Sequence, residues 1–452
     1  MNVSQLQRTD RWLGIPLCLA LTLLRFVASW FRVRPAGPLR TILFVKLAEQ
    51  GSTVLAHGAL CRAVELVGRD NVYFIAFGEN RFILDALGVI PAENVVTLSC
   101  DSFLRLASSA VAALIRLRRL KLDAAVDMEF FSRGSAALTY LSGARRRVGF
   151  HAFFGAGPYR GNLMTHRLLY NPYLHTSQVF QTLVEALLQD PAALPALALR
   201  RSDRVDDLPR FAPETGELHK IEDTVKRELQ RRAGAQSLAC LPPLILLNPN
   251  ASDLLPLRRW PTQRYVELAK RLLSKYQEPA VIFTGAPNEA NAAASLVAQA
   301  GSKRAISLAG QTTLRELLVL YCLADVLVTN DSGPAHFAML TPIHVVTLFG
   351  PETPALYAAR SPRNTVLYAG LACSPCVNAY NNRQTPCRNN LCLQEISVDE
   401  VFAAVCAAYE RSRDRVSSVL CDVSRPQQAQ DSAHRSPLAA GHSETKTSTG
   451  VA

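Results

Sequence analysis

The chain has 452 residues, of which 49% are hydrophobic and 19% are charged, so it is long enough for two domains and too apolar for a disordered protein. Its net charge is +12, but Lys and Arg are scattered and no RRM, C₂H₂ or KH motif occurs, so no nucleic acid is expected as a partner. Anionic lipid or phosphorylated substrates explain a basic surface more simply. The eleven cysteines are an odd number spread along the chain, which excludes a secreted disulfide scaffold and favours a reducing compartment.

The first apolar stretch, Trp12 to Phe31, is 20 residues long and could just span a bilayer. Arg25 lies well inside it, however, and costs roughly 2.5–3.5 kcal/mol at a bilayer centre. The polar residues in and just after the stretch are spaced by three, four and three positions, which places them on one stripe of a helix: Thr22, Arg25, Ser29 and Arg32. We therefore expect residues 12–33 to lie in the plane of a membrane interface. A single span and a helix docked on its own protein are the alternatives.

Beyond a linker rich in Pro and Gly at residues 34–40, short apolar runs alternate with longer helical patterns. This alternation predicts an α/β fold made of two Rossmann-like domains. The predicted division has four parts: an N-terminal helix and linker at 1–40, a first domain at 41–240, a second domain at 241–410 and a tail at 411–452. The tail is polar and rich in Ser, Thr, Gln and His, which predicts disorder.

The first domain places carboxylates at the ends of two predicted strands. Residues 41–45 form an apolar run that leads into a polar loop and then a helix from about Val54, and Glu49 is the only carboxylate of that loop. Such a first strand-to-helix turn is the usual place for a ligand loop. A second strand ends at Asp127, and Glu129 follows it. A carboxylate at the edge of a ligand loop suggests a functional role, and the alternatives are a solvated loop residue or a helix cap.

The second domain begins with a predicted buried strand at 243–247, and a polar loop follows it. This loop carries Asn250, Ser252 and the adjacent pair Arg258 and Arg259. A further strand at 280–284 precedes Glu289, which stands in the first turn of a helix, where an acidic residue also complements the helix dipole. We expect these strand-end loops to converge on one ligand.

The most informative stretch is residues 324–351. A buried strand at 325–329 ends in an Asn-Asp-Ser-Gly turn, and Pro334 stands where the first residue of a helix is expected. Free N–H groups at such a point form an anion site, to which Ser332 adds a hydroxyl donor. Asp331 repels phosphate, so we expect it to hold sugar hydroxyls or to tune a neighbour. The alternative is a helix cap without a ligand.

This stretch resembles glycosyltransferase family 9, the heptosyltransferase family of bacterial lipopolysaccharide synthesis. The family pattern D-[ST]-G-x-x-H stands here as Asp331, Ser332, Gly333 and His336. The resemblance also covers residues 41–60, 123–150, 244–273 and 372–401. It implies a GT-B arrangement, in which two Rossmann-like domains face a cleft, and an inverting glycosyltransferase. Such an enzyme moves heptose or a similar sugar from a nucleotide-diphosphate-sugar to a lipopolysaccharide-type or other cell-surface glycan, and it requires no cofactor.

The resemblance also implies roles for individual residues. The family's base is an Asp directly after a Gly of the first loop, and this position is Ser52 here, whose hydroxyl is no base at neutral pH without an activating partner. Glu49 is then the first substitute, and Asp127 and Glu129 come next. The departure keeps two rival classes open: an epimerase or hydrolase of similar architecture, and a non-catalytic nucleotide-sugar-binding protein.

On the donor side, the resemblance implies small polar donors and a cation for the diphosphate. These places are held by Asn250, Ser252 and Arg258, with Arg259 as the cationic alternative. Glu289 matches a carboxylate that binds the ribose hydroxyls. The cytosolic donor and the apolar N-terminus together predict a location at the cytoplasmic face of the bacterial inner membrane.

Four cysteines near the C-terminus have spacings that also occur in zinc sites: Cys373, Cys376, Cys387 and Cys392. The second pair is wider than the first, and no His lies nearby. Free thiols are at least as compatible with this pattern as zinc, so we assign no metal.

Overall fold

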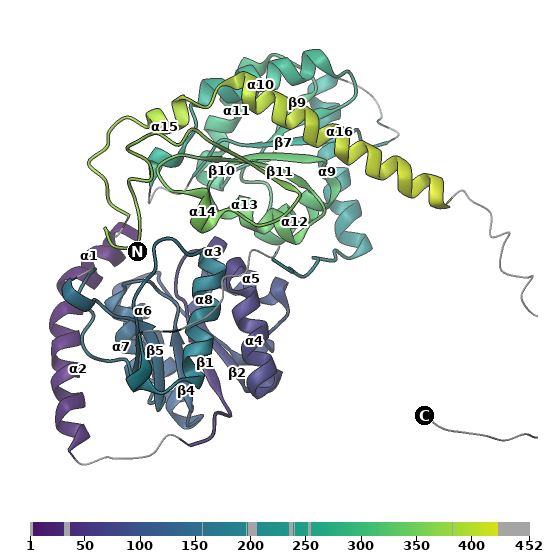
Figure 1. The fold of residues 1–452 in the computed structure, drawn as a ribbon. Helices are drawn as coiled ribbons and strands as arrows, with labels where there is room; N and C mark the ends of the chain where they lie inside the picture. Colours follow the sequence, from purple (N-terminus) through teal and green to yellow (C-terminus); the bar gives the residue numbers. More distant parts are fainter. Residues whose placement is uncertain are drawn as a thin grey trace, which may run out of the picture. The chain divides into compact units, whose positions relative to one another are not determined.

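The computed structural model describes residues 3–30, 37–155, 157–195, 197, 206–234, 238, 240–251, 255–381 and 383–423. The chain divides into two compact units, Met1–Ser412 and Arg413–Ala452. All strands belong to the first unit, which holds two parallel sheets of six strands each (Figure 1).

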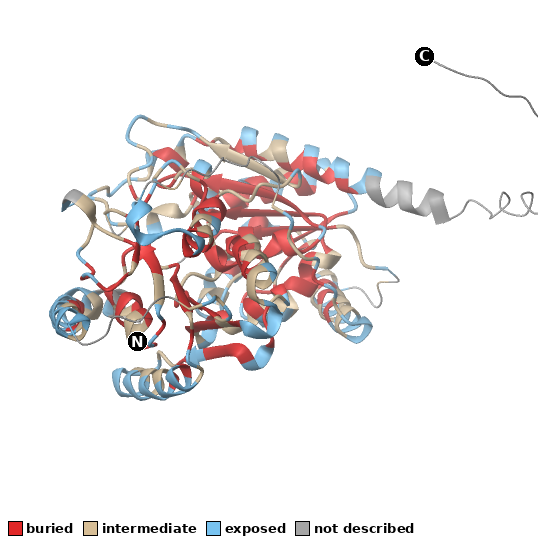
Figure 2. Ribbon diagram, turned by 60° about the horizontal axis from the view of Figure 1, so that its bottom comes forward, coloured by how far each residue is buried: buried red, intermediate tan, exposed pale blue. Residues whose placement is uncertain are grey.

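The first sheet has the strand order β3-β2-β1-β4-β5-β6, and all its neighbours are parallel. Ile42 at the start of β1 pairs with Val72 of β2 and Ala124 of β4. The central strands β1 and β4 are buried along their whole length, as apolar runs in a sheet covered on both faces should be (Figure 2). The strand bounds are β1 Ile42–Val45, β2 Val72–Phe77, β3 Val95–Leu98, β4 Ala124–Asp127, β5 Arg146–Phe150 and β6 His166–Leu168.

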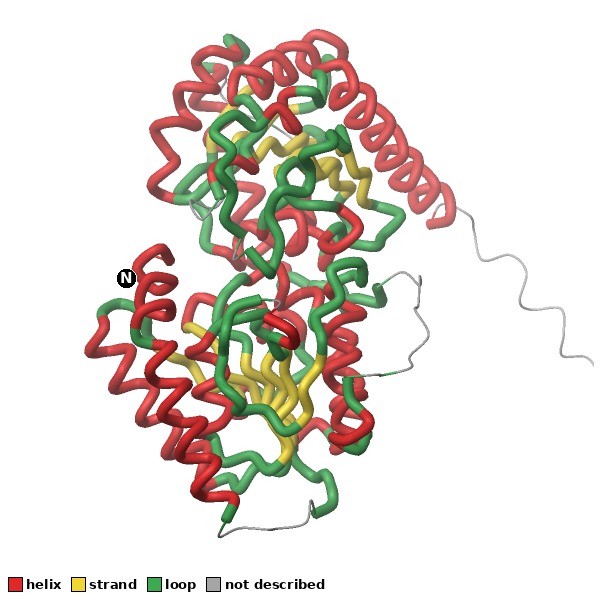
Figure 3. Tube along the Cα trace, turned by 60° about the vertical axis from the view of Figure 1, so that its left-hand side comes forward, coloured by secondary structure: helices red, strands yellow, loops and turns green. Residues whose placement is uncertain are grey.

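Helices cover both faces of this sheet (Figure 3). On one face, α6 (Phe103–Arg119) and α7 (Arg133–Leu141) pack apolar side chains on β1, β2 and β4. On the other face, the core is shared by α3 (Gln50–Leu55), α4 (His57–Val67), α5 (Arg81–Leu87) and α8 (Thr176–Glu185).

The second sheet has the order β12-β11-β10-β7-β8-β9 and is also parallel throughout. Its strands are β7 Leu244–Asn248, β8 Ala280–Phe283, β9 Ala305–Ser307, β10 Val326–Asn330, β11 His344–Phe349 and β12 Asn364–Tyr368. Its helices are α10 Thr262–Lys275, α11 Ala290–Ala300, α12 Leu314–Leu323, α13 Gly333–Phe337, α14 Pro354–Tyr357, α15 Leu391–Gln394 and α16 Val398–Val423. The predicted fold of two Rossmann-like sheets is confirmed.

Helix α9 (Thr215–Ala233) precedes the predicted domain boundary at residue 241 but packs on α12 of the second sheet. Two ion pairs join the helices: Lys220 Nζ lies 2.6 Å from Glu316 Oε1, and Arg315 pairs with Glu217. The chain therefore reaches the second sheet before β7 begins.

The N-terminal stretch forms two helices rather than one, α1 (Val3–Trp12) and α2 (Gly14–Ser29), and α2 packs on α7. Two residues of the expected polar stripe contact the protein, as in the alternative of a helix docked on its own protein. The hydroxyl of Thr22 accepts from the Asn162 N–H at 2.9 Å, and the Arg25 guanidinium donates to the carbonyl and side chain of Asn162. The polar groups of Asn162 need hydrogen-bond partners, and Thr22 and Arg25 supply them. These two residues of the stripe therefore face the protein.

The other side of α2 is exposed and apolar, and Leu23, Leu24, Phe26 and Trp30 are each more than half exposed. Ser29 donates to the Phe26 carbonyl, and Arg32 lies outside the described residues. Within the described ranges, no helix has both the length and the apolar character needed to cross a bilayer.

Candidate functional site

Loops from the two sheets meet where α3 packs against α13. Gly51, at the start of α3, lies directly on the buried ring of His336. A Cβ at Gly51 would be 2.5 Å from His336 Cδ2, so only glycine allows this approach. The contact joins the first loop of the first sheet to the D-S-G-x-x-H turn of the second sheet.

Glu49 lies in this junction with its side chain 25% exposed. Its backbone has a φ of 66°, in the left-handed region that non-glycine residues rarely adopt. The carboxylate accepts from Arg383, lies 3.7 Å from Lys46 Nζ and accepts from the Ser52 hydroxyl at 3.3 Å. The two predicted residues of the first loop are therefore in contact, and Ser52 donates to Glu49 rather than acting as a base.

Glu129 is committed to the first loop. Its carboxylate accepts from the N–H groups of Leu47 and Ala48 at 2.7 and 3.0 Å. The buried Lys46 ammonium lies 3.4 Å from the same oxygen and donates to the Ala48 carbonyl at 3.0 Å. Burial lowers the pKa of Lys46, and Glu129 opposes the shift. These contacts give Glu129 the task of shaping the loop that carries Glu49.

Asp127 is fully buried at the end of β4. It pairs with the buried Arg160 guanidinium, and it accepts from the Ser135 hydroxyl at 3.0 Å and the Glu129 N–H at 3.1 Å. Burial raises the pKa of Asp127 to about 6, against the opposing charge of Arg160. A carboxylate enclosed in this way is placed to hold the β4–α7 turn rather than to meet a substrate.

The predicted donor loops of the second sheet do converge. Asn250 and Glu289 both lie against Gly285, where a Cβ would be 2.8 Å from Asn250 Nδ2 and 2.9 Å from Glu289 Oε2. The Glu289 carboxylate also accepts from the Ala286 N–H at 2.7 Å, the contact expected of an acidic residue in a first helical turn. Ser252 lies outside the described residues.

Asn330, which the sequence indicated only as a turn residue, ties two of these loops together. Its side chain accepts from the Trp260 N–H at 3.0 Å and donates to the carbonyls of Pro249 and Asn250, both at 3.1 Å. The end of β10 thereby fixes the loop after β7.

The two adjacent arginines have different partners: Arg258 pairs with two acids of the predicted site, and Arg259 contacts the backbone of the loop after β7. The Nη2 of Arg258 lies 2.7 Å from Glu352 Oε1, and its Nε lies 3.6 Å from Asp331 Oδ2. Arg259 instead donates to the Ala251 carbonyl at 2.8 and 3.3 Å. Both acids are buried, and burial raises the pKa of Asp331 and raises that of Glu352 to about 7, with Arg258 opposing both shifts.

The turn after β10 places its predicted residues close to these charges. The Ser332 hydroxyl donates to the Asn330 carbonyl at 3.1 Å, and α13 begins at Gly333, one residue before the predicted start at Pro334. His336 is buried, and burial lowers the pKa of its imidazole to about 4, so it is neutral near pH 7. A neutral ring packed on Gly51 shapes the junction and adds no charge to it.

Sequence reasoning missed two residues of the site, Glu352 and Arg383. Arg383 follows β12 in a long loop, pairs with Glu49 at a separation of 334 positions and lies 3.3 Å through its Nε from Glu352 Oε1. Charges therefore alternate along a connected series, which we call the ion chain: Lys46, Glu49, Arg383, Glu352, Arg258 and Asp331. No local pattern announces contacts at this separation. The only available signal was that Glu352 directly follows the Phe-Gly-Pro closure of β11.

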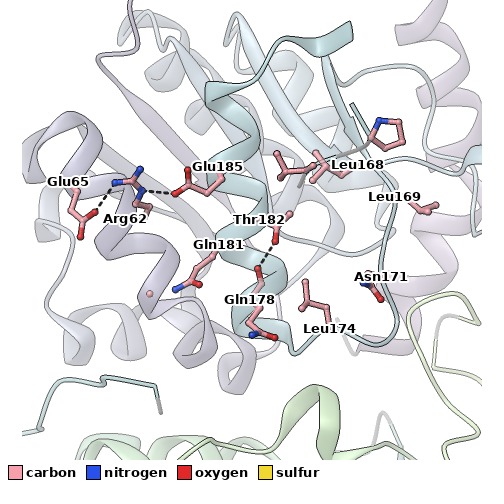
Figure 4. A pocket seen from close by; sticks show the side chains of 13 residues that line it. Arg62, Glu65, Leu168, Leu169, Asn171, Leu174, Gln178, Gln181, Thr182 and Glu185 are labelled. Carbon is pink, nitrogen blue, oxygen red and sulfur yellow. Dashed lines mark hydrogen bonds and ion pairs between the residues drawn. The ribbon is translucent and has the colours of Figure 1, made fainter. Parts of the chain in front are cut away.

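A cavity of about 610 Å³ lies elsewhere, between α4 and α8 of the first sheet (Figure 4). An ion pair between Arg62 Nε and Glu185 Oε1, 2.6 Å apart, lies on its wall. The lining also includes Pro195 and Leu197, which border residues outside the described ranges. None of the predicted site residues lines this cavity.

In the part of the chain that the structure describes, no group of three or more His, Cys, Asp or Glu side chains is placed to hold a metal ion. Cys373, Cys376, Cys387 and Cys392 are all free thiols, and only Cys392 among them is buried.

Two doubly wound parallel sheets, with polar strand-end loops of both meeting at one site, define the chain as an α/β protein of the GT-B fold. Two solved structures share this fold. The ADP-heptose LPS heptosyltransferase II of E. coli has a TM-score of 0.60 at 19% identity, covering 82% of this chain and 99% of its own. The E. coli heptosyltransferase WaaC with ADP has a TM-score of 0.56 at 15% identity, covering 81% and 99%.

The chain belongs to glycosyltransferase family 9 (heptosyltransferase), whose family model matches residues 112–385. A curated relative, lipopolysaccharide heptosyltransferase 2 of Salmonella typhimurium, is 34% identical over 138 residues, 28% of this chain. That match spans only 38% of the relative's length. The predicted family and fold are thus confirmed, whereas the roles of individual residues stay predictions.

Proposed function

We propose that this chain is an inverting glycosyltransferase that moves heptose or a similar sugar from an ADP-sugar to a lipopolysaccharide-type glycan. Family membership supports the reaction class, and the ADP-heptose named for the E. coli structure suggests the donor. The observation that carries the proposal is the junction itself. Arg258 and Asp331 of the second sheet lie in one series of contacts with Glu49, the most accessible carboxylate of the first loop.

In the proposed reaction, Glu49 takes the proton of an acceptor hydroxyl. The acceptor oxygen then attacks the anomeric carbon from the face opposite the diphosphate. A new C–O bond forms, the bond between the anomeric carbon and the diphosphate oxygen breaks, and a nucleoside diphosphate leaves. Arg258 offsets the charge that develops on the leaving group, as preorganised cations do at such centres. The mechanism requires no cofactor.

The test incubates the purified chain with ADP-heptose and glycolipid extracted from cells that lack heptose in their lipopolysaccharide. Acceptor-dependent release of ADP, with heptose appearing in the glycolipid, supports the proposal. ADP release that is the same without acceptor would indicate a hydrolase, and conversion of the donor to another sugar would indicate an epimerase. Tight ADP-heptose binding with no product in either mixture would indicate a binding protein.

We also propose that the chain works at the cytoplasmic face of the bacterial inner membrane. The exposed apolar side of α2 supports this, and α6 adds a second stripe in which Leu104, Val111 and Ile115 are all at least half exposed. Both helices border α7: α2 packs on it, and Arg118 of α6 donates to the Leu141 carbonyl at its end.

The charges of these helices fit an anionic surface. Helices α1, α2 and α6 carry seven arginines and one acid, Asp10. The carboxylate of Asp10 is paired within the protein, because it accepts from the N–H groups of Arg133 and Gly134 at 2.9 and 2.7 Å. Apolar side chains with arginines around them are typical of interfacial binding to anionic lipid.

A further inference from the structure

In the ion chain, protein carboxylates pair with both arginines, Arg258 and Arg383. Arg258 forms an ion pair with Glu352, and Arg383 donates to Glu49 through Nη1 and forms an ion pair with Glu352 through Nε. The two guanidinium groups therefore share one oxygen, Glu352 Oε1, at 2.7 and 3.3 Å. Two partly buried cations this close need an anion between them, and a diphosphate is an anion of suitable charge and size.

The position of Arg383 is enforced by its loop. The residue has a φ of 56°, in the left-handed region, and its guanidinium lies 5.5 Å from the ring centroid of Tyr357. Three positions earlier, the Tyr380 hydroxyl donates to the Tyr170 carbonyl of the first domain at 2.5 Å, and its ring lies 5.6 Å from that of Phe131. These contacts hold the loop against the first sheet and place the Arg383 guanidinium between the carboxylates of Glu49 and Glu352.

The ion pair also limits Glu49. A carboxylate that accepts a charge-assisted hydrogen bond from an arginine is stabilised in its charged form and is a poor proton acceptor. For Glu49 to act as a base, another anion has to replace it as the partner of Arg383.

We propose that Arg383 is a second diphosphate-binding residue and that the diphosphate displaces Glu49 from it. In the structure, Glu49 pairs with Arg383, and Glu352 pairs with both Arg383 and Arg258. When a nucleoside diphosphate binds, its phosphate oxygens replace both carboxylates, and Glu49 is released toward the acceptor. Donor binding then frees Glu49 to accept a proton, and without donor Glu49 stays paired with Arg383. This inference rests on the proposed function for the class of donor.

The test is a double-mutant cycle with ADP as the probe, measured by calorimetry on the full chain. Arg383→Gln should weaken ADP binding roughly 10- to 100-fold, because a charged hydrogen-bond donor is lost. Glu49→Gln should tighten ADP binding roughly tenfold, because the competing charge is removed. In the Arg383→Gln background, Glu49→Gln should have no further effect, because the guanidinium group for which Glu49 and ADP compete is absent.

Arg81→Gln is the matched control, because Arg81 pairs with Asp85 on the exposed surface of α5 and should leave ADP binding unchanged. Thermal melting checks that each variant folds, and Arg383→Lys, which keeps the charge without the fork, replaces Arg383→Gln should the latter unfold. Unchanged ADP affinity in a folded Arg383 variant overturns the proposal. So does an equal effect of Glu49→Gln with and without Arg383. Failure of the unmodified chain to bind any nucleoside diphosphate is a different result, since it refutes the proposed function itself.

Discussion

At the scale of single residues, three carboxylates near the first loop have the same chemistry and different surroundings. Asp127 is enclosed by Arg160 and Ser135, and Glu129 is held by two backbone N–H groups. Only Glu49 keeps a quarter of its side chain exposed while lying beside the second sheet's site. Accessibility therefore favours Glu49 over Asp127 and Glu129 as the proposed base.

Replacing Glu49 by Gln should lower turnover about 10²–10⁴-fold, the usual contribution of a general base. Initial rates of ADP release with saturating donor and glycolipid acceptor measure the effect. Glu79→Gln is the control, because Glu79 follows β2 at the same end of the sheet and should retain the full rate. If Glu49→Gln were fully active, Glu49 would not be the base, and Glu129 or Asp127 would be the next candidate.

Arg258→Ala should weaken ADP binding by roughly 1.5–3 kcal/mol, the range for a hydrogen bond to a charged group. Calorimetry measures the loss. Arg259→Ala provides the comparison, since Arg259 bonds the Ala251 carbonyl and should change affinity far less. A larger effect from Arg259 than from Arg258 would reverse the assignment.

The acidity of Glu352 predicts a pH dependence of donor binding. Burial raises the pKa of this carboxyl to about 7, so it is neutral below that pH and leaves Arg258 available. Above pH 7 the ionised carboxylate competes with the diphosphate, so the affinity for ADP should fall as the pH rises from 6 to 8. ADP itself gains charge in the same range, so the measure is the difference from Glu352→Gln. An identical pH profile in the two proteins would contradict the assignment.

At the scale of elements, the contact between α3 and α13 sets the distance between the two halves of the site. It depends on the absence of a side chain at Gly51, which leaves room for the ring of His336. His336 is neutral and buried, so it fills space rather than binding charge.

Gly51→Ala should therefore destabilise the fold by about 1–3 kcal/mol, the usual cost of forcing a methyl group into a packed site. Turnover should fall as well, because the two loops would be pushed apart. Denaturant unfolding measures the free energy change. Gly216→Ala is the matched control, because no atom lies within 4 Å of a Cβ at Gly216 in α9, and a helical alanine should be neutral or stabilising. Equal stability of the two variants would contradict the packing argument.

At the scale of the first unit, the exposed apolar residues gather on α2 and α6, which both border α7. Thr22 and Arg25 of the polar stripe contact Asn162, so the proposed membrane contact is assigned to the exposed apolar side of α2. The arrangement differs from a free amphipathic helix because the fold fixes how deep each side chain can reach.

The double variant Leu24→Glu, Leu104→Glu should reduce binding to vesicles that contain anionic phospholipid at least tenfold, because both charged groups would have to enter the apolar layer. Flotation with vesicles of anionic and zwitterionic lipid measures the partition. Leu391→Glu is the control, since Leu391 is similarly exposed but belongs to α15 of the second sheet. Vesicle binding that survives the double variant would remove these two helices from the membrane surface, and a chain that never binds vesicles would refute the location.

Most of the strands, the strand-end turns and the family could be predicted from the sequence alone. Each depends on residues that are neighbours in the sequence: apolar runs, a Pro after a Gly turn and a motif within six residues. Such local patterns can be recognised without knowledge of the fold. The sequence also brought Asn250, Arg258, Glu289 and Asp331 to the ends of the second sheet's strands, because parallel strands all end at the same edge.

The orientation of the polar groups and their partners became visible only in the folded structure. Thr22 and Arg25 face Asn162 rather than a membrane, and Glu49 meets Arg383, 334 positions away. Side-chain contacts of this kind depend on how the two sheets and their loops pack, and no periodic pattern encodes that packing. The same reason explains why Glu352 and Arg383 escaped sequence reasoning: each becomes part of a site only when the loops of both sheets meet.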